Sequence, residues 1–139
     1  MPIKEVATKQ VVHYALELQD IGTGATTGVV IDSADYDNGV YFAALVTEWT
    51  AGTCAMTIYE DDAVGMGTAE IVAAKNLIYT SPTLGTAATV EGASIAKLGV
   101  HSTKRYLRVT LTGDGTSNMD VVVLAIKNPE VMATAQGGL

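Results

Sequence analysis

Apolar residues recur at every second position in several short segments of this chain. In the segment 106–112 they stand at Leu107, Val109 and Leu111, and the positions between them are polar. A two-residue period is typical of a strand that buries one face. The segment therefore predicts a half-buried β-strand.

A second apolar run, 94–100, precedes that strand, and the polar, cationic link 101–105 joins the two. A short link between two apolar runs favours a hairpin. We expect residues 94–112 to form the central hairpin of an all-β domain.

The most apolar run is Val40–Trp49. It could be a buried helix, but its length, its β-branched and aromatic residues and its flanking turns favour a strand. The link 50–53 then leads to Cys54–Glu60, where apolar and other residues alternate again. The pattern predicts a second hairpin, although the link is a weaker hairpin signal than an Asn-Gly pair.

A turn at residues 113–118 leads into Met119–Lys127, a run rich in valine with almost no polar face. A strand that is apolar on both faces lies between two layers or is covered by a neighbouring subunit. We expect this last strand to be one of the two.

The first 27 residues allow two interpretations. Val12, Tyr14, Leu16 and Leu18 occupy alternate positions, as in a strand, but apolar residues nearby also share a helical face. The glycine-rich segment 22–28 predicts a loop. It does not match a phosphate-binding loop, because a strand rather than a helix is expected after it.

About eight short strands with turns between them are expected along the chain. That spacing is typical of a sandwich or a barrel. We predict an antiparallel, jelly-roll-like β-sandwich with extended N- and C-terminal arms. The predicted division is an N-terminal arm and first strand at 1–27, the sandwich domain at 28–128 and a C-terminal tail at 129–139.

Charge and composition argue against several partners. Eight Lys and Arg face fifteen Asp and Glu, for a net charge of −7, whereas nucleic-acid binding needs a basic surface. No stretch approaches the roughly 20 apolar residues of a membrane span. The single cysteine, Cys54, cannot form an intrachain disulfide and fits a small core residue. We expect no nucleic-acid or membrane partner, and synthesis in a reducing cytoplasm.

The candidate chemistry is sparse. His13 and His101 are far apart in sequence, and neither belongs to a zinc-binding motif or a nucleophile motif. The acidic segment 60–62 suggests calcium, but the EF-hand ligand pattern is absent, so a solvated acidic turn is the simpler interpretation. We expect no enzyme, no catalytic residue, no metal and no cofactor.

Several segments carry a family resemblance. They are Val30-Ile31-Asp32 with the apolar strand at Val40, the acidic strand end Tyr59-Glu60-Asp61-Asp62, the step Leu98-Gly99, the signature Lys104-Arg105-Tyr106-Leu107-Arg108-Val109, and a last strand ending near Asn128-Pro129. Over about residues 28–130 the chain resembles small structural proteins of tailed bacteriophages. It departs from their pattern at Ala63–Thr68, where an aromatic turn is expected.

The resemblance implies a β-sandwich that decorates and stabilises a phage capsid from outside by binding the major capsid protein. It also implies a homo-oligomer, with a trimer favoured, located on the virion after synthesis in the host cytoplasm. Two alternatives remain: a carbohydrate-binding or adhesin-like sandwich for host attachment, and a neck- or tail-associated structural protein.

Lys104, Arg105 and Arg108 form the densest basic cluster of this acidic chain. They could belong to a solvated turn and a solvent-facing strand. Alternatively, they could meet carboxylates of a neighbouring subunit, because arginine binds carboxylates in a bidentate geometry. We take the three as interface candidates.

Overall fold

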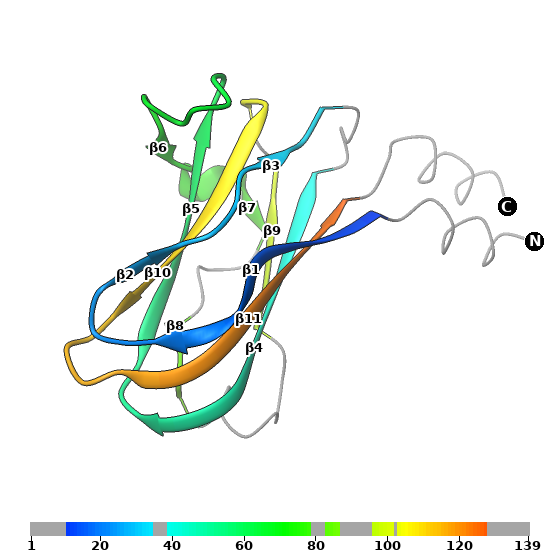
Figure 1. The fold of residues 1–139 in the computed structure, drawn as a ribbon. Helices are drawn as coiled ribbons and strands as arrows, with labels where there is room; N and C mark the ends of the chain where they lie inside the picture. The colour runs from blue at the N-terminus through cyan, green and yellow to red at the C-terminus, as the bar shows by residue number, and fades with distance from the viewer. Residues whose placement is uncertain (1–10, 35–38, 79–82, 87–95, 102, 128–139) are drawn as a thin grey trace, which may run out of the picture.

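Two antiparallel β-sheets pack face to face in the computed structural model of the chain (Figure 1). The structure describes residues 11–34, 39–78, 83–86, 96–101 and 103–127. The predicted β-sandwich is therefore confirmed. The tail at 129–139, residues 1–10 of the N-terminal arm and the Asn128-Pro129 end of the resemblance lie outside the described residues.

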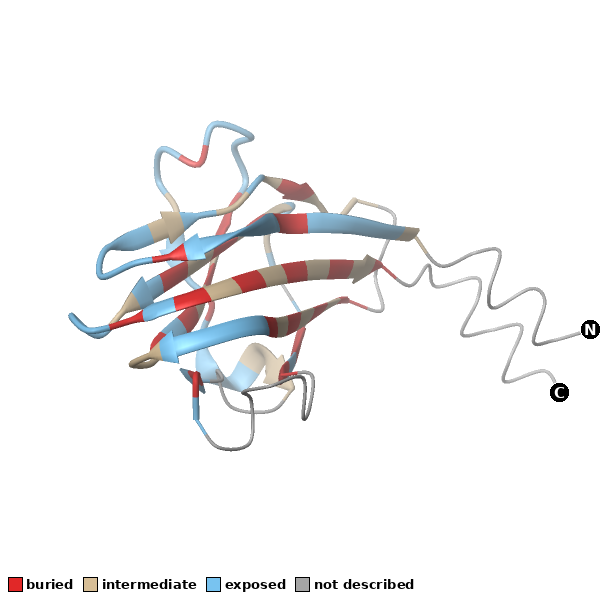
Figure 2. Ribbon diagram, turned by 60° about the horizontal axis from the view of Figure 1, so that its bottom comes forward, coloured by how far each residue is buried: buried red, intermediate tan, exposed pale blue. Residues whose placement is uncertain are grey.

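The first sheet, called sheet A, has the strand order β1-β11-β4-β9-β7. Its strands are β1 (Val11–Ile21), β11 (Asn118–Lys127), β4 (Val40–Ala51), β9 (Ala96–Val100) and β7 (Leu77–Ile78). The long runs predicted from residues 40 and 119 are thus its two central strands. β11 buries every second residue from Met119 to Lys127, and β4 does so from Val40 to Val46, which Figure 2 shows as alternating colours.

The second sheet, sheet B, has the order β2-β10-β5-β6. Two further strands join it, since β3 pairs with β10 and β8 pairs with β5. Its strands are β2 (Ala25–Thr27), β10 (Tyr106–Gly113), β5 (Cys54–Asp61), β6 (Glu70–Ile71), β3 (Ile31–Asp32) and β8 (Thr83–Leu84). A single turn of 3₁₀-helix, η1 (Ala74–Asn76), precedes β7.

Consecutive long strands alternate between the two sheets. The chain passes from β4 in sheet A to β5 in sheet B, and from β9 in sheet A through β10 in sheet B to β11 in sheet A. The first and last strands are neighbours, with Val11 opposite Lys127. This order is that of a jelly roll, an architecture that limits exposed sheet edges.

The two hairpins predicted at 94–112 and at 40–60 are wrong, because the two strands of each lie in different sheets. β9 pairs with β4 and β7, whereas β10 pairs with β2, β3 and β5. Likewise β4 and β5 belong to different sheets. The strands themselves were predicted correctly. Alternation reports that a segment buries one face, but a five-residue link spans the roughly 10 Å between sheets as readily as it closes a hairpin.

β1 is a strand, not a helix, but its alternation is interrupted. Its register with β11 shifts between Tyr14 and Leu16 and again between Leu16 and Gln19. Ala15 and Leu16 are consequently both buried, while Leu18 is exposed. Such bulges change which face a side chain occupies. Because β1 contributes to the core, the sandwich includes the first strand that was predicted to lie with the N-terminal arm.

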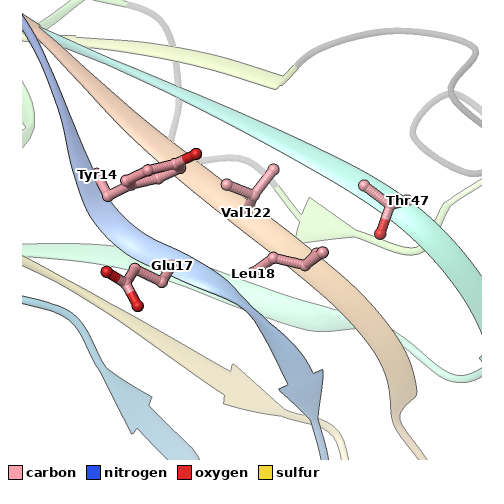
Figure 3. A pocket seen from close by; sticks show the side chains of 5 residues that line it. All are labelled: Tyr14, Glu17, Leu18, Thr47 and Val122. Carbon is pink, nitrogen blue, oxygen red and sulfur yellow. The ribbon is translucent and has the colours of Figure 1, made fainter.

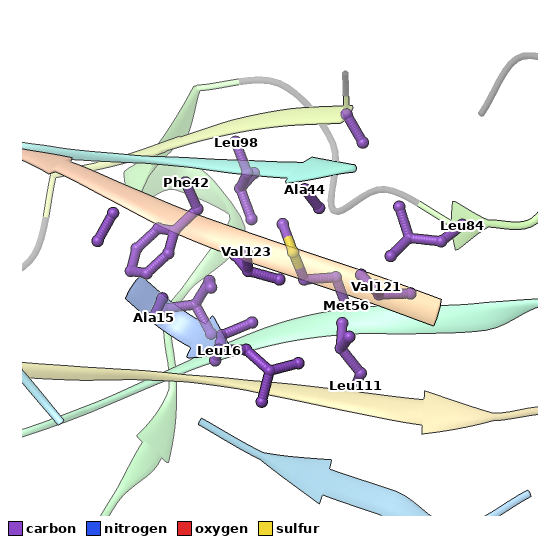
Figure 4. Close-up of a cluster of buried hydrophobic side chains, with 14 of the residues drawn as sticks. Ala15, Leu16, Phe42, Ala44, Met56, Leu84, Leu98, Leu111, Val121 and Val123 are labelled. Atoms are coloured by element: carbon purple, nitrogen blue, oxygen red, sulfur yellow. The ribbon is translucent and has the colours of Figure 1, made fainter. Parts of the chain in front are cut away.

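The core between the sheets consists of aliphatic side chains around Phe42 (Figure 4). Leu98 comes from β9, Met56 from β5, and Leu107 and Leu111 from β10, and all are almost fully buried. Each such side chain contributes roughly 1.5–3 kcal/mol of transfer free energy. The core thus joins every long strand of both sheets.

Asp114 fixes the corner where two of the crossings meet. Its carboxylate accepts hydrogen bonds from the backbone N–H of Thr116 at 2.9 Å and of Thr53 at 3.0 Å. These donors lower the pKa of Asp114 to about 2, with the bond from Thr116 the largest cause. The link between β4 and β5 is thereby tied to the link between β10 and β11.

Candidate functional site

The predicted basic cluster is divided by the fold. Lys104 and Arg105 lie in the link before β10, and Arg108 lies within β10. Arg105 meets Asp32 of β3 in a bidentate contact, with Nε 3.0 Å from Oδ1 and Nη2 2.9 Å from Oδ2. Lys104 lies 3.6 Å from Glu70 of β6. Two of the three cations therefore have carboxylate partners within their own chain.

Asp32 connects three elements. Besides the side-chain contact with Arg105, its backbone carbonyl accepts a bond from Nζ of Lys127, at the end of β11. The hydrogen bonds from Arg105 are the main reason that the pKa of Asp32 falls to about 2. Burial lowers the pKa of Lys127, although the charge of Asp32 opposes that effect. This end of the sandwich is held together by internal charge pairing.

Arg108 is the member of the cluster that points elsewhere. It lies opposite Tyr59 on the outer face of sheet B, because its neighbours Leu107 and Val109 point into the core. Its Nε is buried and has no hydrogen-bond partner among the described residues. A guanidinium favours carboxylates as partners. The prediction that Arg108 meets a neighbouring subunit stays a prediction.

The acidic segment 60–62 was expected to be a solvated turn, and this expectation is wrong for two of its residues. Glu60 and Asp61 are buried. The carboxylate of Asp61 accepts bonds from the backbone N–H groups of Ala63 and Thr68 and from the Thr68 hydroxyl. The bond from Ala63 is the largest cause of its lowered pKa. Asp61 holds the loop 62–68 in place, so its oxygens already have partners.

Other candidate chemistry is not assembled in the described part of the chain. No group of three or more His, Cys, Asp or Glu residues there could hold a metal ion. Cys54 is fully buried, and burial raises the pKa of its thiol to about 11. His13 lies on β1 and His101 follows β9, both exposed. In the same residues, no helix is long and apolar enough to cross a membrane.

The outer face of sheet A is apolar along half of its length. Val12, Tyr14 and Leu18 of β1 are each more than half exposed. The register places Val12 opposite Ile126 and Tyr14 opposite Leu124 of β11, so these side chains share one face. The apolar face continues onto β4 with Tyr41, Ala43 and Leu45, which lie opposite Ile126, Leu124 and Val122.

A shallow hollow lies within this face (Figure 3). It is lined by Tyr14, Glu17, Leu18, Thr47 and Val122 and has a volume of about 400 Å³. In Figure 3 the side chain of Leu18 extends over β11 near Val122. An uninterrupted alternation would place Tyr14, Leu16 and Leu18 all on this face. The register shift after Tyr14 instead turns Leu16 into the core, and the second shift, before Gln19, leaves Leu18 on the outer side.

The other half of the outer face is acidic. Asp20 of β1 lies opposite Asp120 of β11, and Asp120 lies opposite Glu48 of β4. The three carboxylates thus form a row across three strands, and a second, smaller hollow is lined by all of them. Sequence analysis missed this row because its members are far apart in the chain, and only the strand register brings them together.

The comparisons with known proteins add no relative. No model of a protein family matches this chain, and no curated protein matches it either.

Proposed function

We propose that this chain is a non-enzymatic structural protein of a tailed-phage virion, which decorates and stabilises the capsid by binding the shell of the major capsid protein. The signature Lys104–Val109 supports the phage assignment by resemblance. The jelly roll supports it by architecture, since viral capsid domains include this fold. Lectin domains use the same fold, so the architecture alone does not separate the two classes.

The observation that carries the proposal is the open apolar face of sheet A. Isolated exposed apolar residues are ordinary, but a contiguous apolar surface over three neighbouring strands marks a protein interaction site. β11 contributes to both sides, with Val121 and Val123 in the core and Val122 and Leu124 on the outer face. The sequence predicts that β11 is covered on both faces. Sheet B covers its inner face, so a cover for its outer face requires a partner outside the chain.

The carbohydrate-binding alternative has less support. A sugar site of the calcium type would need free carboxylate oxygens near residues 60–62, and those of Asp61 accept bonds from the loop 62–68. Sugar stacking would need exposed aromatic rings on a concave surface. Among the described residues, Tyr14 is the one aromatic residue that lines the hollow, beside Glu17, Leu18, Thr47 and Val122. Protein contact fits this surface better.

Binding to heads tests the proposed function. Heads of the phage that encodes this chain, purified from a strain without the gene, are mixed with the purified protein and sedimented. We expect saturable binding at a fixed number of copies per head. Binding only to tails, or no binding at any concentration, would contradict the proposal.

Assembly into a homo-oligomer, for which the resemblance favours a trimer, belongs to the same proposal, with Arg108 as its contact. Arg108→Ala should lower the mass of the protein in solution while the thermal unfolding temperature changes little, because Nε makes no hydrogen bond within the described residues. Arg105→Ala is the matched control, since Arg105 already pairs with Asp32. An unchanged mass for Arg108→Ala would exclude it as the contact.

A further inference from the structure

We infer that the outer face of sheet A is the surface by which this protein docks on the capsid shell, and that the shell site is apolar at one end and carries Lys or Arg side chains at the other. This inference rests on the proposed function and specifies its partner chemistry. It follows from the uneven distribution of charge along the face.

The apolar end of the face provides contact area. β1, β11 and β4 contribute three apolar side chains each, and beyond β4 the ring of Tyr41 packs against Gly99 of β9. A Cβ at Gly99 would lie 2.9 Å from Cε1 of Tyr41 and 3.0 Å from Cβ of Ile78. The side chains of Tyr41 and Ile78 therefore fill the space over Gly99, and the apolar surface continues from β4 across β9 to β7.

The acidic end of the face fixes the orientation in which the protein docks. Like charges directly opposite one another destabilise a sheet, so the row of Asp20, Asp120 and Glu48 does not serve folding. Carboxylates at the rim of an apolar contact instead select a partner with cations at the matching position and speed its association. The row thus fixes which end of the shell site lies under which end of the sheet.

The same charges argue against a second copy of this chain as the occupant. Among the described residues of the outer face, Lys97 of β9 is the only cation, and it lies opposite Ala43 rather than near the acidic row. Two copies packed through this face would leave at least four of six carboxylates without a cation, and each chain carries a net charge of −7. A different protein with a basic rim fits better.

The hollow beside Leu18 is the expected centre of the contact. It lies within the apolar half, where Tyr14, Leu18 and Val122 form one wall beside Glu17 and Thr47, and it could enclose an apolar side chain of the shell. Such enclosed contacts near the middle of an interface carry most of the binding energy. Substitutions at Leu18 should therefore weaken binding more than those at the margin of the face.

The test uses the sedimentation assay with three variants. Leu18→Lys places a charge in the hollow, Asp120→Lys reverses the charge at the centre of the acidic row, and Val64→Lys is the control on the exposed loop between β5 and β6 of sheet B. All three sites are at the surface or at the outer side of a strand, and thermal unfolding verifies folding. The affinity of the original chain for heads is also measured between 50 and about 300 mM salt.

We expect Leu18→Lys to weaken head binding at least tenfold, Asp120→Lys to weaken it severalfold, and Val64→Lys to bind as the original chain does. The original affinity should fall with salt, and Asp120→Lys should reduce that dependence.

If the original chain binds heads and both sheet A variants bind as well as it does, the inference is overturned while the proposed function stands. If the original chain does not bind heads at all, both fail. A dimer in solution that Leu18→Lys dissociates would assign the face to a second copy and also overturn the inference.

Discussion

At the scale of single residues, the carboxylates of three aspartates stabilise the fold by accepting hydrogen bonds. Asp32 and Asp114 each accept hydrogen bonds from a segment distant in sequence, and Asp61 accepts bonds from Ala63 and Thr68 of the loop that follows it. Hydrogen bonds to a carboxylate favour its ionised form, so the pKa of each of the three is lowered. Their charges are structural, whereas those of the row Asp20, Asp120 and Glu48 are not.

The protein should lose stability in acid through these residues. The pKa of Asp32 falls from 3.8 to about 2 in the folded chain. Its contribution is therefore complete above pH 4 and is lost as the pH falls towards 2. The side chain of Asp32 is 44% exposed, so solvent screening limits the contribution to roughly 0.5–1 kcal/mol. Asp32→Asn should flatten the pH dependence of the unfolding free energy between pH 4 and 2, as measured by urea denaturation.

A double-mutant cycle isolates the ion pair. Arg105→Gln and Asp32→Asn should each lower stability, and the double variant should lose less than the sum of the two. Additive losses would mean that the pair contributes no coupling, and that Asp32 acts through the N–H of Ala34 alone.

The thiol of Cys54 should be inert in the native protein. It is fully buried with a pKa of about 11, so at pH 8 it is protonated and inaccessible. Labelling by a thiol-specific reagent should be slow in native buffer and immediate in urea. Cys54→Ser should cost about 1–3 kcal/mol, because it buries a hydroxyl in an apolar site, whereas Cys54→Ala should cost less. Fast labelling of the native protein would contradict this burial.

At the scale of elements, the strands were far easier to predict from the sequence than their partners. The alternation of Leu107, Val109 and Leu111 predicted β10 and its buried face correctly. The pairing failed, because adjacent strands in a jelly roll lie in different sheets and local patterns contain no signal for the crossing. β2 was missed within the segment 22–28, since its three residues pair only through contact with β10.

The close approach of the segment after β2 to β1 depends on one glycine. Gly28 follows β2, its N–H donates to the carbonyl of Val109, and a Cβ there would lie 2.0 Å from the carbonyl oxygen of Ala15. Gly28→Ala should therefore destabilise the fold by roughly 1–3 kcal/mol through overpacking. Gly24→Ala is the matched control, because its Cβ would meet nothing within 4 Å. Equal unfolding free energies for both variants would show that β1 does not pack against the segment after β2 as described.

At the scale of the whole molecule, the candidate site emerged only from the assembled sheet. The sequence singled out Lys104, Arg105 and Arg108, and the fold pairs two of them internally. The sequence predicted part of the apolar face of sheet A, since Met119–Lys127 has almost no polar face. Its full extent could not be predicted, because it depends on the bulges of β1 and on the register of three strands.

If the chain is a capsid protein as we propose, cryo-microscopy of the parent phage particle is the decisive measurement. We expect density for the jelly roll on the outside of the capsid, with the outer face of sheet A against the shell. The row Asp20, Asp120 and Glu48 should lie beside Lys or Arg side chains of the coat protein. Density confined to the neck or tail, or sheet A turned towards solvent, would contradict this expectation.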